Sequence, residues 1–159
     1  MLNNLKELLQ DPQFNEEVNW KPYSYGSEQK IINEGENDRN IYLVLKGVVH
    51  VSTYIILNEN ERRGMGIAKL SENDVFGEVS MFDDMPRSAN VIAAGDCEIA
   101  AIDCASFNEY LRKHPEKGYY VMRNIVEQLV KRMRHNNIRS NSILAWYLLE
   151  NDEPLTNCQ

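Results

Sequence analysis

The sequence predicts a mainly β protein: an antiparallel β-roll, or double-stranded β-helix of the jelly-roll kind, flanked by an N-terminal helix and a long C-terminal helix. Short apolar runs separated by turn residues fill the chain from Tyr23 to about Asp103. Leucines at helical spacing precede this region, and a long uninterrupted helical pattern follows it. Short strands joined by tight turns, with no long helix between them, are typical of an antiparallel sandwich or roll.

Residues 1–20 form the expected N-terminal helical segment. Its leucines recur at steps of three, three and one residues, which places them on one helix face: Leu2, Leu5, Leu8 and Leu9. Asp11-Pro12 ends this helix because proline cannot continue it. A second short turn is expected from Phe14 to Val18.

Residues 21–104 form the expected β-roll. The apolar runs that we interpret as strands are 30–32, 41–45, 48–51, 54–57, 66–68, 90–93 and 98–102. The segments between them are rich in Gly, Asn, Asp and Glu, which favour turns. The charged segment 58–64 is interpreted as a longer, looser hairpin connection.

Residues 105–150 form the expected C-terminal helices, and 151–159 a mobile tail. A short helix from Ala105 to Arg112 precedes Pro115, which is well placed to start the next helix. The long helix has an apolar stripe at steps of three and four residues: Tyr119, Met122, Ile125, Val126, Leu129, Val130 and Met133. Ordinary core packing explains its first half. For the second half we expect pairing with another copy, giving a homodimer.

Composition narrows the class of protein. A chain of 159 residues fits one domain with a helical appendage. The net charge of −7 disfavours a broad nucleic-acid surface, which needs clustered lysine and arginine. The three cysteines, an odd number without CxxC spacing, indicate reduced thiols. No segment has the apolar length of a membrane span, and the N-terminus is too polar for a signal peptide, so we expect a cytoplasmic protein.

The segment 76–89 is the most informative part of the chain. Gly77 allows a sharp turn, and residues 78–82 favour one helical turn whose unpaired N–H groups suit an anion. Pro86 restricts the backbone before Arg87, whose planar guanidinium can contact two phosphate oxygens. A turn glycine, a surface glutamate or a structural arginine would each mean little alone. Their conjunction between two strands predicts a site for a phosphate with a neighbouring hydroxyl, as in a cyclic nucleotide.

This segment resembles the phosphate-binding cassette of the cyclic nucleotide-binding domain family. The resemblance runs from about Tyr23 to Arg134 and includes Glu34-Gly35-Glu36, Gly47 and the segment 74–78; Asn73 stands where many relatives have glycine. It implies an eight-stranded roll in which Glu78 receives the ribose 2′-hydroxyl and Arg87 holds the cyclic phosphate. The site residues predicted in the cassette are Gly77, Glu78, Val79, Ser80, Arg87, Ser88 and Ala89.

The base contacts are left open. By similarity to the family, Asn136 and Asn137 would face the base, and an asparagine amide could read either purine. Trp146 or Tyr147 could stack on the base instead. Ser88 favours cyclic AMP over cyclic GMP by resemblance. The basic residues of this helix are interpreted mainly as solvated positions: Lys131, Arg132, Arg134, His135 and Arg139.

The function predicted from these features is a cyclic nucleotide sensor that transmits binding through its long C-terminal helix. Residues 140–159 are acidic near their end and lack a basic recognition helix, so we expect no direct DNA binding and an unknown downstream protein. The alternatives are a protein-interaction module of the same fold that binds no nucleotide, or the effector part of a transcription regulator. We expect no enzyme and no metal, since His50, His114 and His135 are far apart in the chain.

Overall fold

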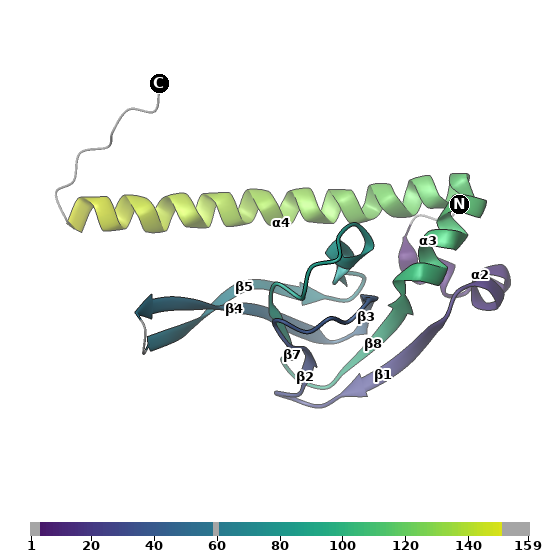
Figure 1. Cartoon of the computed structure of the whole chain (residues 1–159), viewed down its shortest axis with the longest axis horizontal. Coiled ribbons are helices and arrows are strands. Elements are labelled where there is room, and N and C mark those ends of the chain that lie inside the picture. Colours follow the sequence, from purple (N-terminus) through teal and green to yellow (C-terminus); the bar gives the residue numbers. More distant parts are fainter. Residues whose placement is uncertain (1–3, 59–60, 151–159) are drawn as a thin grey trace, which may run out of the picture.

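Two four-stranded sheets form the body of the protein, and one long helix lies across it (Figure 1). The computed structural model describes residues 4–58 and 61–150. Every strand pairing among these residues is antiparallel. The predicted fold, a mainly β roll flanked by helices, is confirmed.

The first sheet has the strand order β1-β8-β3-β6, and the second has the order β2-β7-β4-β5. The strands of the first sheet are β1 (Trp20–Tyr25), β8 (Cys97–Asp103), β3 (Asn40–Lys46) and β6 (Val75–Phe76). Those of the second are β2 (Lys30–Ile32), β7 (Asn90–Ala93), β4 (Val48–Asn58) and β5 (Glu61–Ser71). Buried side chains from both sheets, including Val44, Val49 and Ile99, pack against one another between the layers.

Helices cover the other face of the first sheet. They are α1 (Leu5–Leu8), α2 (Pro12–Glu17), α3 (Cys104–Lys113) and the first turns of α4 (Pro115–Glu150). Phe14 lies edge-on to both Phe107 and Tyr110, and all three side chains are fully buried. Asn4 and Asp11 cap α1 and α2 through side-chain oxygens that accept backbone N–H groups. This helical core fixes the root of α4 against the roll.

The expectation of a loose connection at 58–64 is wrong for residues 61–64, which belong to the β4–β5 hairpin. Tyr54 pairs with Gly64 and Ile55 with Arg63, so residues 61–64 belong to a strand. Both faces of the projecting hairpin reach solvent here, and charged side chains are tolerated on an exposed strand. A bulge lies between Val51 and Ser52. The connection at 59–60 and the expected tail at 151–159 lie outside the described residues.

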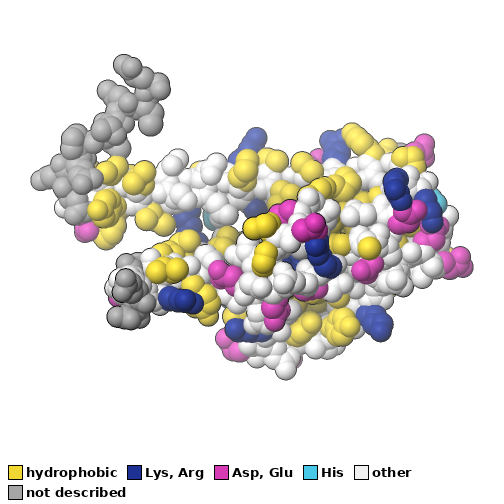
Figure 2. Space-filling model, in the orientation of Figure 1, with side chains coloured by type: hydrophobic (Ala, Val, Ile, Leu, Met, Phe, Trp, Pro, Cys, Tyr) yellow, Lys and Arg dark blue, Asp and Glu magenta, His cyan; other side chains and the backbone are white. Residues whose placement is uncertain are grey.

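The second half of α4 carries uncovered apolar side chains. Val121 and Ile125 are buried in the core, as expected for the first half of this helix. Beyond them, the exposed residues of the helix include Val126, Val130, Met133, Ile138, Ile143, Leu144, Trp146, Tyr147 and Leu149. Figure 2 shows hydrophobic side chains gathered at this end of the helix. Within the described ranges, no helix combines the length and the apolar character that crossing a bilayer requires.

Candidate functional site

The chain enters the cassette through a left-handed turn at Gly77. Strand β6 ends at Phe76, Gly77 has a φ of +71°, and the 3₁₀-helix η1 (Glu78–Met81) follows at once. A Cβ on Gly77 would lie 2.7 Å from Nη1 of Arg87 and 3.1 Å from the carbonyl oxygen of Asn40. Glycine is therefore required here for two independent reasons, its backbone conformation and the space it leaves.

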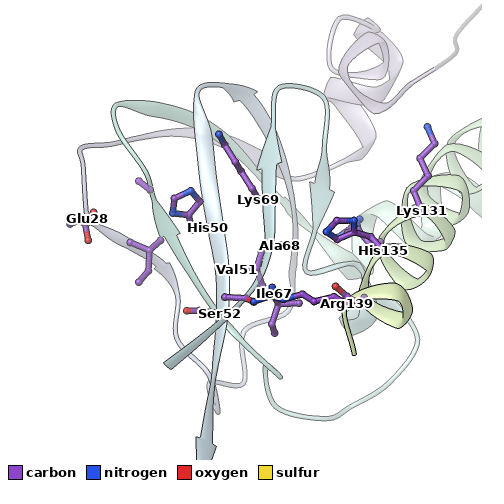
Figure 3. A pocket seen from close by; sticks show the side chains of 15 residues that line it. Glu28, His50, Val51, Ser52, Ile67, Ala68, Lys69, Lys131, His135 and Arg139 are labelled. Atoms are coloured by element: carbon purple, nitrogen blue, oxygen red, sulfur yellow. Dashed lines mark hydrogen bonds between the residues drawn. The ribbon is translucent and has the colours of Figure 1, made fainter. Parts of the chain in front are cut away.

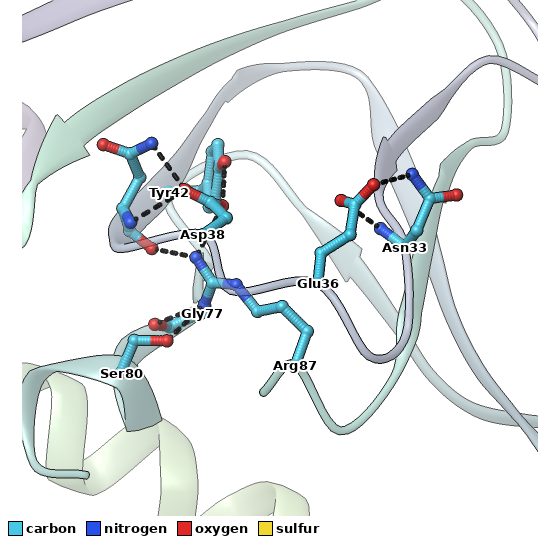
Figure 4. Close-up of polar contacts among 8 residues, drawn as sticks. Asn33, Glu36, Asp38, Tyr42, Gly77, Ser80 and Arg87 are labelled. Carbon is cyan, nitrogen blue, oxygen red and sulfur yellow. Dashed lines mark hydrogen bonds and ion pairs between the residues drawn. The ribbon is translucent and has the colours of Figure 1, made fainter. Parts of the chain in front are cut away.

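Arg87 lies at the centre of a polar network (Figure 4), with only 7% of its surface exposed. Its Nη1 donates to the carbonyl oxygen of Gly77 at 3.0 Å and to Oγ of Ser80 at 2.7 Å. Its Nη2 donates to Oδ2 of Asp38 at 2.7 Å and to the carbonyl oxygen of Asn40 at 2.5 Å. Nε is buried and has no hydrogen-bond partner among the described residues. The guanidinium is thus held inside the roll, with one donor left over.

Asp38 is the counter-ion of Arg87, and nothing in the cassette motif points to it. Tyr42 donates its hydroxyl to the same carboxylate at 2.5 Å. Burial raises the pKa of Asp38, but the hydrogen bonds from Tyr42 and Arg87 outweigh it and leave the pKa below the ordinary value of 3.8. Burial, together with the Asp38 charge, raises the pKa of Tyr42. Asp38 therefore stays ionised beside the guanidinium at neutral pH.

The backbone of Arg87 is fixed by the loop that follows β2. Gly35 donates its N–H to the carbonyl oxygen of Arg87, and Arg87 donates its own N–H to the carbonyl oxygen of Glu36, both at 2.8 Å. Gly35 has a φ of +86°. The Glu34-Gly35-Glu36 motif thus positions the cassette arginine. Asn73 has a φ of +72°, so it adopts the left-handed conformation that asparagine was expected to tolerate here.

Glu78 and Arg132 link the cassette to α4. Glu78 is 4% exposed, and its Oε1 lies 3.6 Å from Nη1 of Arg132. Nη2 of Arg132 donates to the carbonyl oxygen of Val75 at 2.7 Å. The interpretation of Arg132 as a solvated position is therefore wrong. The inward position of Arg132 could have been predicted from its spacing, because Ile125, Leu129 and Arg132 follow one another at steps of four and three on one face of the helix.

All the predicted cassette residues line one cavity of about 190 Å³. Its lining includes Gly77, Glu78, Val79, Ser80, Arg87, Ser88 and Ala89. A larger groove of about 790 Å³ between α4 and the second sheet shares Val51 and Arg132 with this cavity (Figure 3). Of the residues predicted to face the base, Asn136 lines the groove; Asn137, Trp146 and Tyr147 line neither the groove nor the cavity. The base-facing role of these residues stays a prediction.

The fold and the cavity together define a β-roll with one small cavity that is lined by a buried arginine and a buried carboxylate. A family model described as cyclic nucleotide-binding domain matches residues 23–114. The chain belongs to the cyclic nucleotide-binding domain family. Its fold is shared by the catabolite activator protein of Thermus thermophilus, which superposes with a TM-score of 0.63 at 23% identity, covering 78% of this chain and 55% of that one.

Relatives and solved structures agree with this assignment. A cAMP-activated global transcriptional regulator, CRP, of Pasteurella multocida is 29% identical over 78% of this chain and 56% of its own length. The regulator Vfr of Pseudomonas aeruginosa is 30% identical over 69% of this chain and 51% of its own. A cyclic nucleotide-binding domain from Methylobacillus flagellatus superposes with a TM-score of 0.67 at 28% identity, covering 76% of this chain and 65% of that one. The chain spans about half the length of the curated relatives it matches.

Proposed function

We propose that this domain is a cyclic AMP sensor of the cytoplasm, in which Arg87 binds the cyclic phosphate and Glu78 accepts the ribose 2′-hydroxyl. The observation that carries the proposal is the pair of buried charged groups on one small cavity: Arg87 with an unpartnered Nε, and Glu78 within the first turn after Gly77. A buried guanidinium suits a phosphodiester, since charge-assisted hydrogen bonds are the strongest that a side chain makes. Ser88 and the N–H groups of η1 and Ala89 add donors on the same cavity.

Ligand binding, on this proposal, exchanges partners at two points. The phosphate takes donors of Arg87 that are now bound to Ser80 and Asp38. The ribose hydroxyl donates to Glu78, which now faces Arg132. Because Arg132 belongs to α4, the second exchange changes what holds this helix against the cassette. The ligand shifts the equilibrium between two positions of α4, and the size of this shift is set by the difference between its affinities for the two positions.

The base extends from the cassette cavity into the groove. The cavity of about 190 Å³ is smaller than the ~300–1,000 Å³ of typical ligand sites, so it accommodates the ribose and phosphate alone. Asn136 is the asparagine on the groove and is the side chain that we assign to the base. Cyclic AMP is preferred to cyclic GMP because of Ser88 and because both curated relatives are named as cAMP-activated.

The output of the sensor is assigned to α4. Its exposed apolar side chains beyond Ile125 suit a second copy of the chain, so we propose a homodimer paired along this helix. A downstream protein would receive the change in helix position. The chain spans about half the length of its curated relatives, which are transcriptional regulators. The second candidate function is therefore that this domain is the effector part of a transcription regulator.

The test is Arg87→Ala, measured by calorimetric titration and thermal shift with cyclic AMP and cyclic GMP. We expect a loss of about 1.5–3 kcal/mol in binding free energy, tenfold or more in Kd, because charge-assisted hydrogen bonds are removed. Arg39→Ala is the matched control. Arg39 also reaches the cassette, through the carbonyl oxygen of Asp83 and the carboxylate of Asp84, but it is exposed and does not line the cavity.

Two outcomes decide against the proposal. Unchanged affinity in folded Arg87→Ala protein would remove Arg87 from the site. Identical melting curves of the wild type with every cyclic nucleotide would favour the alternative, a protein-interaction module that keeps the fold without the ligand. The expectation of no catalytic activity stays a prediction.

A further inference from the structure

We propose that the groove beside the cassette receives a second phosphate, so that the domain binds a cyclic dinucleotide more tightly than the matching mononucleotide. This inference rests on the proposed function, since the first phosphate is assigned to Arg87. It differs from that function in the ligand class and in the residues that select it.

The first argument is size. The groove has a volume of about 790 Å³, against about 190 Å³ for the cassette cavity, and both are lined by Val51 and Arg132. The groove alone lies in the upper part of the ~300–1,000 Å³ range of ligand sites. A single purine base would leave most of it to water. A second nucleotide, linked to the first, would extend from the cavity past Arg132 into this space.

The second argument is charge. The groove is lined by Lys69, Lys131, Arg132 and Arg139, by the imidazoles of His50 and His135, and by one carboxylate, Glu28. This concentration of cations stands in a chain whose net charge is −7. In the described part of the chain, Lys69, Lys131 and Arg139 make no ion pair with a carboxylate. Uncompensated like charges repel one another, and an anion in the groove relieves that repulsion.

The third argument is the placement of these side chains (Figure 3). His50 and Lys69 are register partners on β4 and β5. Lys131, His135 and Arg139 follow one another at steps of four along α4. The Nη1 of Arg139 donates to the carbonyl oxygen of Gly66 on β5 at 2.5 Å, which joins the helix to the hairpin at the far end of the groove. His50 and Lys69 alternate along their strands with Val51 and Ala68, which pack against the core, so they lie on the outer face of the sheet at the rim of the groove. The positive charge that lines the groove therefore comes mainly from α4.

These features favour a phosphodiester over a bare base. Arginine can stack on a neutral purine or donate to its edge, but a purine carries no net charge that would neutralise several cations at once. A phosphodiester carries one negative charge with several acceptor oxygens and matches lysine and arginine directly. The link between the two nucleotides also makes the second contact intramolecular, so that its effective concentration is high.

The experiment titrates the purified chain with cyclic AMP, cyclic di-AMP, cyclic GMP and cyclic di-GMP. We expect the dinucleotide of at least one purine to bind about tenfold or more tightly than its mononucleotide. In the double variant Lys131→Gln/Arg139→Gln, the affinity for that dinucleotide should fall about tenfold while the mononucleotide changes less than about threefold. Arg123→Gln/Arg134→Gln is the control, because it removes the same charge from the same helix outside the groove.

Each outcome separates the two proposals. If cyclic AMP binds and both dinucleotides bind no tighter than their mononucleotides, the second-phosphate site is wrong and the sensor function stands. An equal loss for both ligands in the groove variant also overturns the site. If none of the four nucleotides binds, the sensor function fails, and the groove proposal fails with it. Tight dinucleotide binding without cyclic AMP binding supports the groove and refutes cyclic AMP as the ligand. Thermal unfolding of each variant checks that it is folded.

Discussion

Substituting Gly77 by alanine tests the geometry on which the cassette depends. A left-handed conformation costs an alanine about 1–2 kcal/mol relative to glycine. The new Cβ would lie 2.7 Å from Nη1 of Arg87, so the guanidinium must move and its hydrogen bonds to Ser80 and the Gly77 carbonyl are strained or lost, at about 1–2 kcal/mol more. Together this is about 2–4 kcal/mol, or a melting temperature about 4–16 °C lower for a chain of this size.

The assay for Gly77→Ala is urea unfolding combined with a cyclic AMP titration. Affinity should fall at least about tenfold, because the arginine no longer occupies its position. Gly64→Ala is the control: Gly64 lies on the exposed hairpin, and a Cβ there would meet nothing within 4 Å, so the stability should change by less than about 0.5 kcal/mol. A Gly77→Ala protein that matches the wild type in both stability and affinity would refute the argument.

Two further predictions concern stability. Phe107→Ala should lower the free energy of unfolding by about 3–5 kcal/mol in urea titrations, because the ring is fully buried in the core under α3; a loss below about 1 kcal/mol would show that this core is loosely packed. The pKa of Asp38 is lowered in the folded state, so its contribution is complete above pH 3.8 and is lost as the pH falls through the lowered pKa. The stability gap between wild type and Asp38→Asn should therefore stay constant from pH 7 to about pH 4 and narrow below it in urea unfolding, and a gap that stays constant down to pH 3 would contradict the assigned ion pair.

The features that the sequence predicts well are local ones. The turn at Gly77, the short helix after it and the arginine that follows lie within about fourteen residues. The conformation of such a short motif depends mainly on its own residues, so it can be predicted from the sequence. Most strands of the roll were also predicted, because short apolar runs end at clear turn residues; β1 (Trp20–Tyr25) and β6 (Val75–Phe76) were not among the predicted runs.

The features that the sequence does not predict depend on distant pairing. Asp38 lies 49 positions from Arg87, and only the folded sheets bring the two together. The strand at 61–64 is formed by pairing with β4, which no local propensity of its charged residues indicates. Arg132 was identifiable in principle from its helical spacing, yet its position among basic residues favoured the solvated interpretation.

The ion pair between Arg132 and Glu78 has a mechanical consequence, because it lies well before the end of α4. At 1.5 Å per residue, the helix extends about 27 Å from Arg132 to Glu150. A tilt of about 10° pivoting at this contact would carry the far tip sideways by about 5 Å, while the contact itself would hardly move. On the proposed function, a helix of this length would act as a lever, and a change of one hydrogen-bond partner at Glu78 would become a larger movement at its far end.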